Sequence, residues 1–270
     1  MNRHISVAVL LGAALLASCD ALTDNGPQDI TAPVPSARVK FHNFSPSSVG
    51  VDFFANDTKM TAVLTSGCGA PTTAADSTAC STSGIESTTG TKYGVVASGG
   101  RYDAIAPGQY TLVARIAATT DVVSTVSEAI ADGKYYSFFM SGPYNSSTKT
   151  AEAFVIEDPI PGGAIDYSVA KVRFVNAVSD GTGPLTLYAA DAETKVESAA
   201  GGAVAYKSGS DFVSVPQGTY SLAARYTGSS TNTISRTAVS FIAGHMYTIT
   251  ARGSTATSST LGLDYTETQP

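Results

Sequence analysis

Short segments in which hydrophobic and polar residues alternate run along the chain from residue 37 onward. In ARVKFHN (residues 37–43), Ala, Val, Phe and Asn fill every second position and Arg38 and Lys40 stand between the apolar ones. Side chains of a strand point to opposite faces with a period of two. The segment therefore predicts a strand with one apolar face and one basic, solvated face. Similar segments follow, bounded by Gly, Pro, Asn or Asp, which is typical of strands and hairpins.

Each of these segments has a second copy further along the chain. The matched pairs are ARVKFHNFS (37–45) with AKVRFVNAVS (170–179), VDFFAND (51–57) with LTLYAAD (185–191), IAPGQYTLVAR (105–115) with VPQGTYSLAAR (215–225), and GKYYSFFMSG (133–142) with GHMYTITARG (244–253). Two copies of one unit are the simplest interpretation. We predict repeats at 37–157 and 170–270, joined by a Pro/Gly-containing linker at 158–169. Several short strands per repeat predict an all-β fold of two tandem immunoglobulin- or transthyretin-like β-sandwich domains.

The repeated motifs also resemble a known family. ARVKFHNFSPSSVGVDFF, then YGVV, then APGQYTLVAR are similar to the bacterial family called domain of unknown function 4397. The second copy departs from the pattern, because NAVSDGTG lacks the turn proline and Thr186 stands where the first copy has Asp52. The resemblance covers residues 37 to about 157 and 170 to about 265. It implies a β-rich fold in a secreted or envelope location and brings no activity.

The N-terminus has a different pattern. A basic start precedes ISVAVLLGAALLA (5–17), which is shorter than the roughly 20 apolar residues that a membrane-spanning helix needs but fits a secretory signal. Leu16-Ala17-Ser18-Cys19 resembles a bacterial lipobox, which implies that residues 1–18 are a lipoprotein signal peptide and that Cys19 carries lipid. The alternative is an ordinary secretion signal with a chance cysteine. Residues 19–36 are polar with three prolines and predict a flexible tether.

The first copy carries an insertion of about 23 residues between about Met60 and Tyr93. It contains the other two cysteines, Cys68 and Cys80. Because export places them in an oxidising compartment, we predict a disulfide, worth about 3 kcal/mol for a loop of this length. Two free thiols are the alternative, and no histidine lies nearby to favour a metal.

Charge and motifs exclude several functions. The net charge is −6 and no stripe of Lys or Arg occurs, which excludes a nucleic-acid partner. No nucleophile elbow, P-loop, calcium loop or zinc helix is present in the sequence, so we predict no catalytic, cofactor-binding or metal-binding residues. His42 and His245 are predicted to be surface histidines. Tyr110 and Tyr220 are predicted to pack at sandwich corners with their hydroxyls hydrogen-bonded.

Three functions remain open. The sequence favours a lipid-anchored cell-envelope protein, on the periplasmic or surface face, that acts as a non-enzymatic interaction or structural module. Its partners would be the membrane, through the N-terminal lipid, and an envelope protein or glycan. A glycan-binding lipoprotein is the alternative, because tyrosine is plentiful at 13 residues, although tryptophan is absent. A hydrolase with a spatially assembled site is the third, with scattered carboxylates such as Asp191 and Glu193 interpreted as solvated loop charges.

Overall fold

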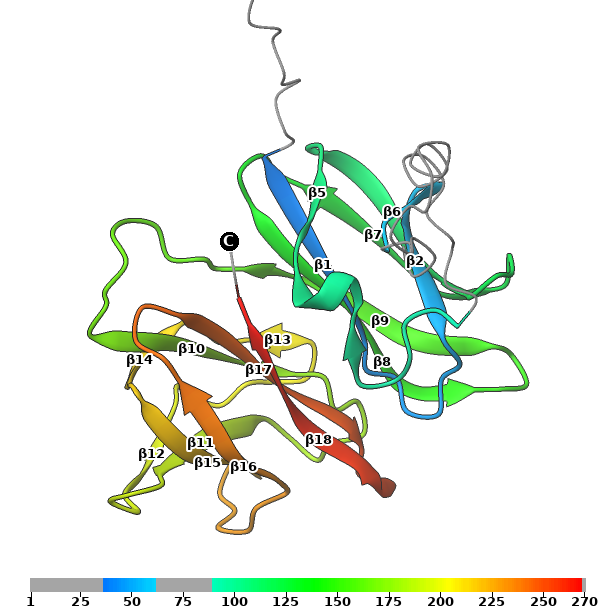
Figure 1. Cartoon of the computed structure of the whole chain (residues 1–270). Helices are drawn as coiled ribbons and strands as arrows, with labels where there is room; N and C mark the ends of the chain where they lie inside the picture. Colours follow the sequence, from blue (N-terminus) through cyan, green and yellow to red (C-terminus); the bar gives the residue numbers. More distant parts are fainter. Residues whose placement is uncertain (1–35, 62–88, 269–270) are drawn as a thin grey trace, which may run out of the picture. The chain divides into compact units, whose positions relative to one another are not determined.

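The computed structural model describes residues 36–61 and 89–268, all within one compact unit, Pro35–Pro270. In these ranges the regular elements are β-strands and one short 3-10 turn, η1 (Ala97–Gly100). The strands form four sheets, two from each half of the chain (Figure 1). The predicted all-β class with two sandwich-like domains is confirmed. Within the described ranges, no helix has the length and apolar character needed to cross a membrane.

The first sandwich consists of an inner sheet, which contacts the second sandwich, and an outer sheet. The inner strands are β1 (Ala37–Asn43), β4 (Val95–Val96), β5 (Asp103–Ile105), β8 (Tyr135–Asn145) and β9 (Thr150–Asp158). The outer strands are β2 (Val51–Ala55), β3 (Thr58–Lys59), β6 (Gly108–Ile116) and β7 (Val122–Ile130). β1 runs parallel to β8, and the other ladders are antiparallel.

The second sandwich has the same strand order. Its inner strands are β10 (Val169–Asn176), β13 (Ser208–Gly209), β14 (Val213–Pro216), β17 (Met246–Ser254) and β18 (Thr257–Glu267). Its outer strands are β11 (Leu185–Asp191), β12 (Glu197–Ala199), β15 (Gly218–Tyr226) and β16 (Ile234–Phe241). Here β10 runs parallel to β17, as β1 does to β8. Similar sequence patterns thus build the same topology twice.

Alternate residues of the repeated strands form the two hydrophobic cores. On β1, Ala37, Val39 and Phe41 are at most 1% exposed, and Phe41 stacks on Phe53 of the facing sheet with ring centroids 5.1 Å apart. The equivalent residues of β10 are buried in the second core. The apolar half of the predicted alternation is therefore correct. Each fully buried Val or Phe side chain among them contributes about 1.5–3 kcal/mol to folding.

An asparagine at the end of each of these strands is hydrogen-bonded to a later segment of the same repeat. The Nδ2 atom of Asn43 donates to the Thr91 carbonyl at 2.8 Å, and that of Asn176 donates to the Val204 carbonyl at 3.1 Å. The Asn176 side-chain oxygen also accepts from the Val178 amide at 3.1 Å. Because buried amides need such partners, the repeated asparagine serves the fold.

The prediction that the first strand of each repeat has a solvated face is wrong for the central residues of that face. Lys40 is 2% exposed, and His42 and Arg173 are each 1% exposed. His42 is therefore not a surface histidine. The reason is that the outer surfaces of the two inner sheets pack against each other, so both faces of β1 and β10 are covered. Of the basic residues on these strands, Arg38 and Lys171, nearer the strand starts, keep partial exposure.

The corner interpretation holds for Tyr220. Its side chain is 6% exposed, and its hydroxyl donates to the Pro216 carbonyl at 2.9 Å. Tyr110 is partly buried and packs against the first core.

Replacing Tyr220 with phenylalanine is expected to lower the free energy of unfolding by about 1 kcal/mol, because one intramolecular hydrogen bond is lost and the ring packing is kept. Chemical denaturation of the two proteins measures the difference. Tyr167→Phe is the control, since Tyr167 is 76% exposed and its change should leave stability as it was. Equal stabilities for all three proteins would contradict the corner interpretation.

Candidate functional site

An aromatic cluster joins the two sandwiches. Its buried members are Phe44, Phe139, Phe154, Val175 and Ala177, with Val96, Ile156 and Tyr206 packed at the edge. Residues from both repeats belong to it, and β8 and β17 are in contact across it. The Phe154 ring lies edge-on to the Tyr206 ring, with centroids 5.9 Å apart. Burial of this area stabilises one arrangement of the two sandwiches.

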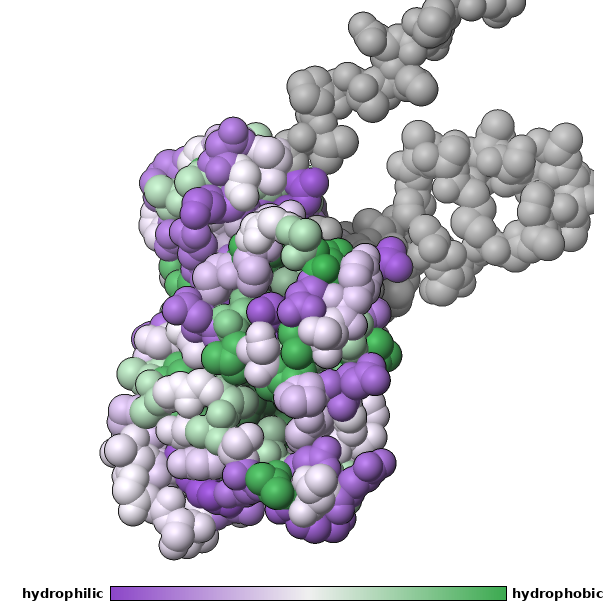
Figure 2. Space-filling view, turned by 90° about the vertical axis from the view of Figure 1, so that its left-hand side faces the viewer, coloured by the Kyte–Doolittle hydropathy of each residue, from purple (hydrophilic) through white to green (hydrophobic). Residues whose placement is uncertain are grey.

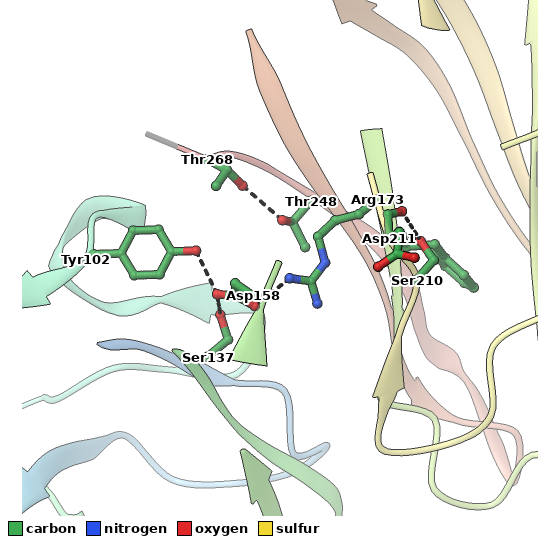
Figure 3. A network of polar contacts seen from close by, with 9 residues as sticks. Tyr102, Ser137, Asp158, Arg173, Ser210, Asp211, Thr248 and Thr268 are labelled. Carbon is green, nitrogen blue, oxygen red and sulfur yellow. Dashed lines mark hydrogen bonds and ion pairs between the residues drawn. The ribbon is translucent and has the colours of Figure 1, made fainter. Parts of the chain in front are cut away.

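A buried polar network lies beside this cluster, with the Asp158 carboxylate at its centre (Figure 3). The Nη1 atom of Arg173 donates to Asp158 Oδ1 at 2.6 Å, and both side chains are at most 3% exposed. Tyr102 and Ser137 each donate a hydroxyl hydrogen bond to Asp158 Oδ2 at 2.6 Å. Asp158 is the last residue of β9 and Arg173 lies within β10, so the ion pair connects the two sandwiches directly.

Lys40 adds a second positive charge next to the network. Its ammonium lies 4.1 Å from the centroid of the Tyr102 ring. Burial lowers the pKa of Lys40 to about 8, although the nearby Asp158 carboxylate acts in the opposite direction. Burial, together with the same carboxylate, raises the pKa of Tyr102. The Asp158 carboxylate thus supplies the negative charge that offsets the buried positive charges of Lys40 and Arg173.

His42 is buried in this interface without a polar partner. Its ring stacks on Phe139 with centroids 4.2 Å apart and lies edge-on to Phe44 at 5.2 Å. Within the residues that the structure describes, neither ring nitrogen has a hydrogen-bond partner. Burial, and next the positive charges of Lys40 and Arg173, lower the pKa of His42 well below its usual 6.5. The imidazole is neutral at pH 7 and is sealed from any substrate.

A second feature is a recess of about 480 Å³ on the second sandwich, between β12 and β14, which we call the β12–β14 groove. These strands pair only with β11 and β10, respectively, among the described residues, so the two sheets separate here. Figure 2 shows the molecule from the side on which β12 and β14 lie in Figure 1, where hydrophobic residues gather in a hollow with hydrophilic residues around it. A recess of this size is within the range of small-molecule sites.

The groove combines an apolar floor with polar walls. Ala189, Ala200 and Val215 lie at its base and are 3%, 5% and 8% exposed. The polar side chains along it are Asp191, Glu193, Thr194, Ser198, Ser214 and Gln217. Such a lining binds ligands by a few hydrogen bonds around an apolar contact.

Asp191 uses one of its two carboxylate oxygens to stabilise the turn that it begins. Its Oδ1 atom accepts hydrogen bonds from the amides of Glu193 and Thr194 and from the Thr194 hydroxyl, at 2.7–3.0 Å. Those bonds, led by the Thr194 amide, lower the pKa of Asp191. The group is therefore an ionised acceptor. Its Oδ2 atom has no hydrogen bond of this kind within the turn.

The other residues singled out from the sequence have varied outcomes. Cys19, Cys68 and Cys80 lie outside the described residues, as do the predicted signal peptide and most of the tether. His245 is half-buried, and its Nδ1 atom lies 2.7 Å from Glu267 Oε1. In the described part of the chain, no group of three His, Cys, Asp or Glu side chains is placed to hold a metal.

Sequence reasoning missed both features because their parts are remote in the chain. One signal for the interface was present, since residues 135–140 (YYSFFM) are almost continuously apolar. A run of this kind indicates a strand that is buried on both faces. No comparable signal marks the groove, since Ser198 and Ser214 look like ordinary polar positions.

The sequence model of the family described as Domain of unknown function (DUF4397) matches residues 170–270. The resemblance to this family is therefore confirmed over the second repeat. No curated protein gives a significant match. One similar solved structure is the crystal structure of CBMbc (family CBM26) from Eubacterium rectale Amy13K in complex with maltoheptaose. It is 12% identical, the match covers 87% of this chain and 97% of that chain, and the TM-score of 0.25 is too low to support an argument.

Proposed function

With residues 170–270 matched to the DUF4397 family, whose description names no activity, we propose that the chain is a lipid-anchored cell-envelope protein. Its two sandwiches act together as a non-enzymatic interaction module. The anchor is lipid on Cys19, and residues 19–36 hold the folded part away from the membrane. This rests on the lipobox-like sequence Leu16-Ala17-Ser18-Cys19.

The observation that supports a structural or interaction role best is the buried contact between the sandwiches. The Asp158–Arg173 pair and the aromatic cluster fix one sandwich against the other. A chain with independent domains would have solvated residues there. A fixed pair of sandwiches holds its exposed loops and grooves in one geometry, which lowers the entropy lost when a partner binds.

The same observation argues against chemistry at the interface. A general base must reach the proton that it removes. His42 and Lys40 are at most 2% exposed, and Asp158 already accepts three hydrogen bonds. These groups stabilise the contact between the sandwiches and have no room for a substrate.

Replacing Cys19 with serine is expected to abolish incorporation of labelled palmitate into the protein, because the Cys19 thiol is the proposed attachment site of the acyl chains that anchor it. Metabolic labelling followed by immunoprecipitation measures this. Mass spectrometry of the wild-type N-terminal peptide should show acylated cysteine as its first residue. Cys68→Ser is the matched control and should incorporate palmitate as the wild type does. Absence of label from the wild-type protein, or equal labelling of Cys19→Ser, would contradict the lipid anchor.

The interaction role has a separate test. Crosslinking of intact cells that carry the wild-type protein should give covalent adducts with another envelope component, which mass spectrometry or glycan staining identifies. Recovery of the uncrosslinked chain alone, under conditions that crosslink a known envelope complex, would contradict the interaction role.

A further inference from the structure

We infer that the β12–β14 groove binds an uncharged, hydroxyl-rich ligand, that is, a neutral saccharide. This inference rests on the proposed interaction function and names the ligand class and its site. It is carried by the shape of the groove, by the signs of the charges along it and by the kinds of hydrogen-bonding groups that it presents.

The shape of the groove suits a small ligand or a short stretch of a longer one. Its volume is about 480 Å³, and ligand sites in proteins commonly measure about 300–1,000 Å³. It opens along the side where β12 and β14 end their sheets, so a chain could enter and leave it. Its floor is made of small side chains such as Ala189 and Ala200, which leave room for a ring.

The charges along the groove disfavour anionic ligands. Among the described residues, the charged side chains that line it are those of Asp191 and Glu193. Two ammonium groups lie beside the lining and already have partners. Lys171 donates to Ser214 Oγ at 2.8 Å, and Lys195 donates to the Ala192 carbonyl. Phosphates, sulfated glycans and uronic acids would meet the carboxylates of Asp191 and Glu193 among the lining side chains, which disfavours their binding.

The hydrogen-bonding groups match a polyol. Carboxylates accept from hydroxyls, an amide both donates and accepts, and serine hydroxyls do either. Because Ser214 Oγ accepts from Lys171, its own proton is available to a ligand. Gln217 and Ser198 supply further groups along the walls.

The apolar part of the groove suits contact with the carbon face of a sugar ring. It does not act as a flat aromatic surface on which a sugar stacks. Tyr220 lines the groove, but it is 6% exposed and its hydroxyl is bonded to Pro216. Contacts would come from Val215 and the alanines of the floor. Val196 stands at the rim and is 66% exposed, so a bound ring would also cover a hydrophobic side chain that is otherwise in water.

The test uses the full wild-type chain, purified in detergent, on an array of uncharged glucans, mannans, galactans and xylans. Anionic glycans and polyamines on the same array are the comparison probes. We expect binding to at least one uncharged class and none to the anionic probes. Isothermal titration with the best oligosaccharide then gives the affinity.

Two variants locate the site. Ser198→Trp, on β12, should fill the groove and weaken binding at least tenfold, and Glu193→Gln should weaken it several-fold. The matched control is Ser235→Trp on β16, an exposed serine on the opposite edge strand of the same sheet, which should bind as the parent does. Thermal unfolding confirms that all variants are folded.

Three results would overturn the inference. They are no binding to any uncharged glycan, preferential binding to polyamines, and unchanged binding by Ser198→Trp. If one of these results were obtained while crosslinked adducts of the wild-type protein were still recovered from cells, the saccharide inference alone would fail and the proposed interaction function would stand. If the adducts were also absent, the proposed function would fail with it.

Discussion

Replacing Asp158 with asparagine is expected to lower the free energy of unfolding by about 3–5 kcal/mol, as the loss of one partner from a buried ion pair does. The change keeps the shape of the side chain and removes its charge. Arg173 then loses its anion at a site where it is 1% exposed, and the Lys40 ammonium loses the nearest carboxylate. Equilibrium denaturation in urea at pH 7 measures the difference.

The neighbouring residue on the same strand is the control. Glu157 is exposed and pairs with Lys134 at 2.8 Å on the surface, so Glu157→Gln should cost less than about 1 kcal/mol. Adding Arg173→Met to Asp158→Asn should recover part of the loss, because no unpaired guanidinium then remains buried. A loss below 1 kcal/mol for Asp158→Asn would show that the network does not hold the two sandwiches together.

Replacing His42 with leucine is expected to raise the free energy of unfolding by about 1–2 kcal/mol at pH 7. The leucine has a similar volume and removes two buried nitrogens that have no hydrogen-bond partner among the described residues. An unsatisfied buried polar group costs about 1–3 kcal/mol. The second repeat already has Val175 at the equivalent position, where it is fully buried.

The same substitution should change the response to acid. The pKa of His42 is far below 6.5 in the folded protein, so the unfolded chain binds a proton below pH 6.5 when the folded chain does not. Stability then falls with decreasing pH, by up to about 1.4 kcal/mol per pH unit from this group. His42→Leu should lose that part of the slope between pH 6.5 and 4.5, whereas the surface variant His245→Gln should keep it. If the free energy of unfolding of the wild type and of His42→Leu changed equally with pH in this range, the burial of His42 would be contradicted.

Much of the fold could be predicted from the sequence because strands follow local rules. The alternation in residues 37–43 and its second copy at 170–176 gave the strand positions and the apolar faces correctly. Turn residues bounded the hairpins, and a repeated pattern implied a repeated topology. These signals depend on residues close together in the chain.

The contact between the sandwiches could not be predicted in the same way. Lys40 and Arg173 look solvated in an alternating strand, because charged side chains are rarely buried unless they are paired. Their pairing with Asp158 depends on which sheet faces meet. Period-two patterning separates two faces of a strand and does not say what covers each one. The apolar run at 135–140 was the one local indication that β8 has no solvated face.

The groove was harder to predict still. Asp191 and Glu193 were expected to be solvated loop charges, and Asp191 does hold a turn. Their place along a recess depends on the separation of β12 from β14, which is a property of two sheets together. A binding site between sheet edges has no motif of its own in the sequence.

The burial of His42 is the most direct test that the two inner sheets pack against each other. Diethyl pyrocarbonate modifies accessible neutral imidazoles, and peptide mass spectrometry reads each site separately. His245, whose side chain is 42% exposed, serves as the internal reference. We predict that His245 is modified in the folded protein while His42 stays unmodified until urea unfolds the chain. Modification of both at similar rates in the absence of urea would contradict the buried interface and the joint action of the two sandwiches.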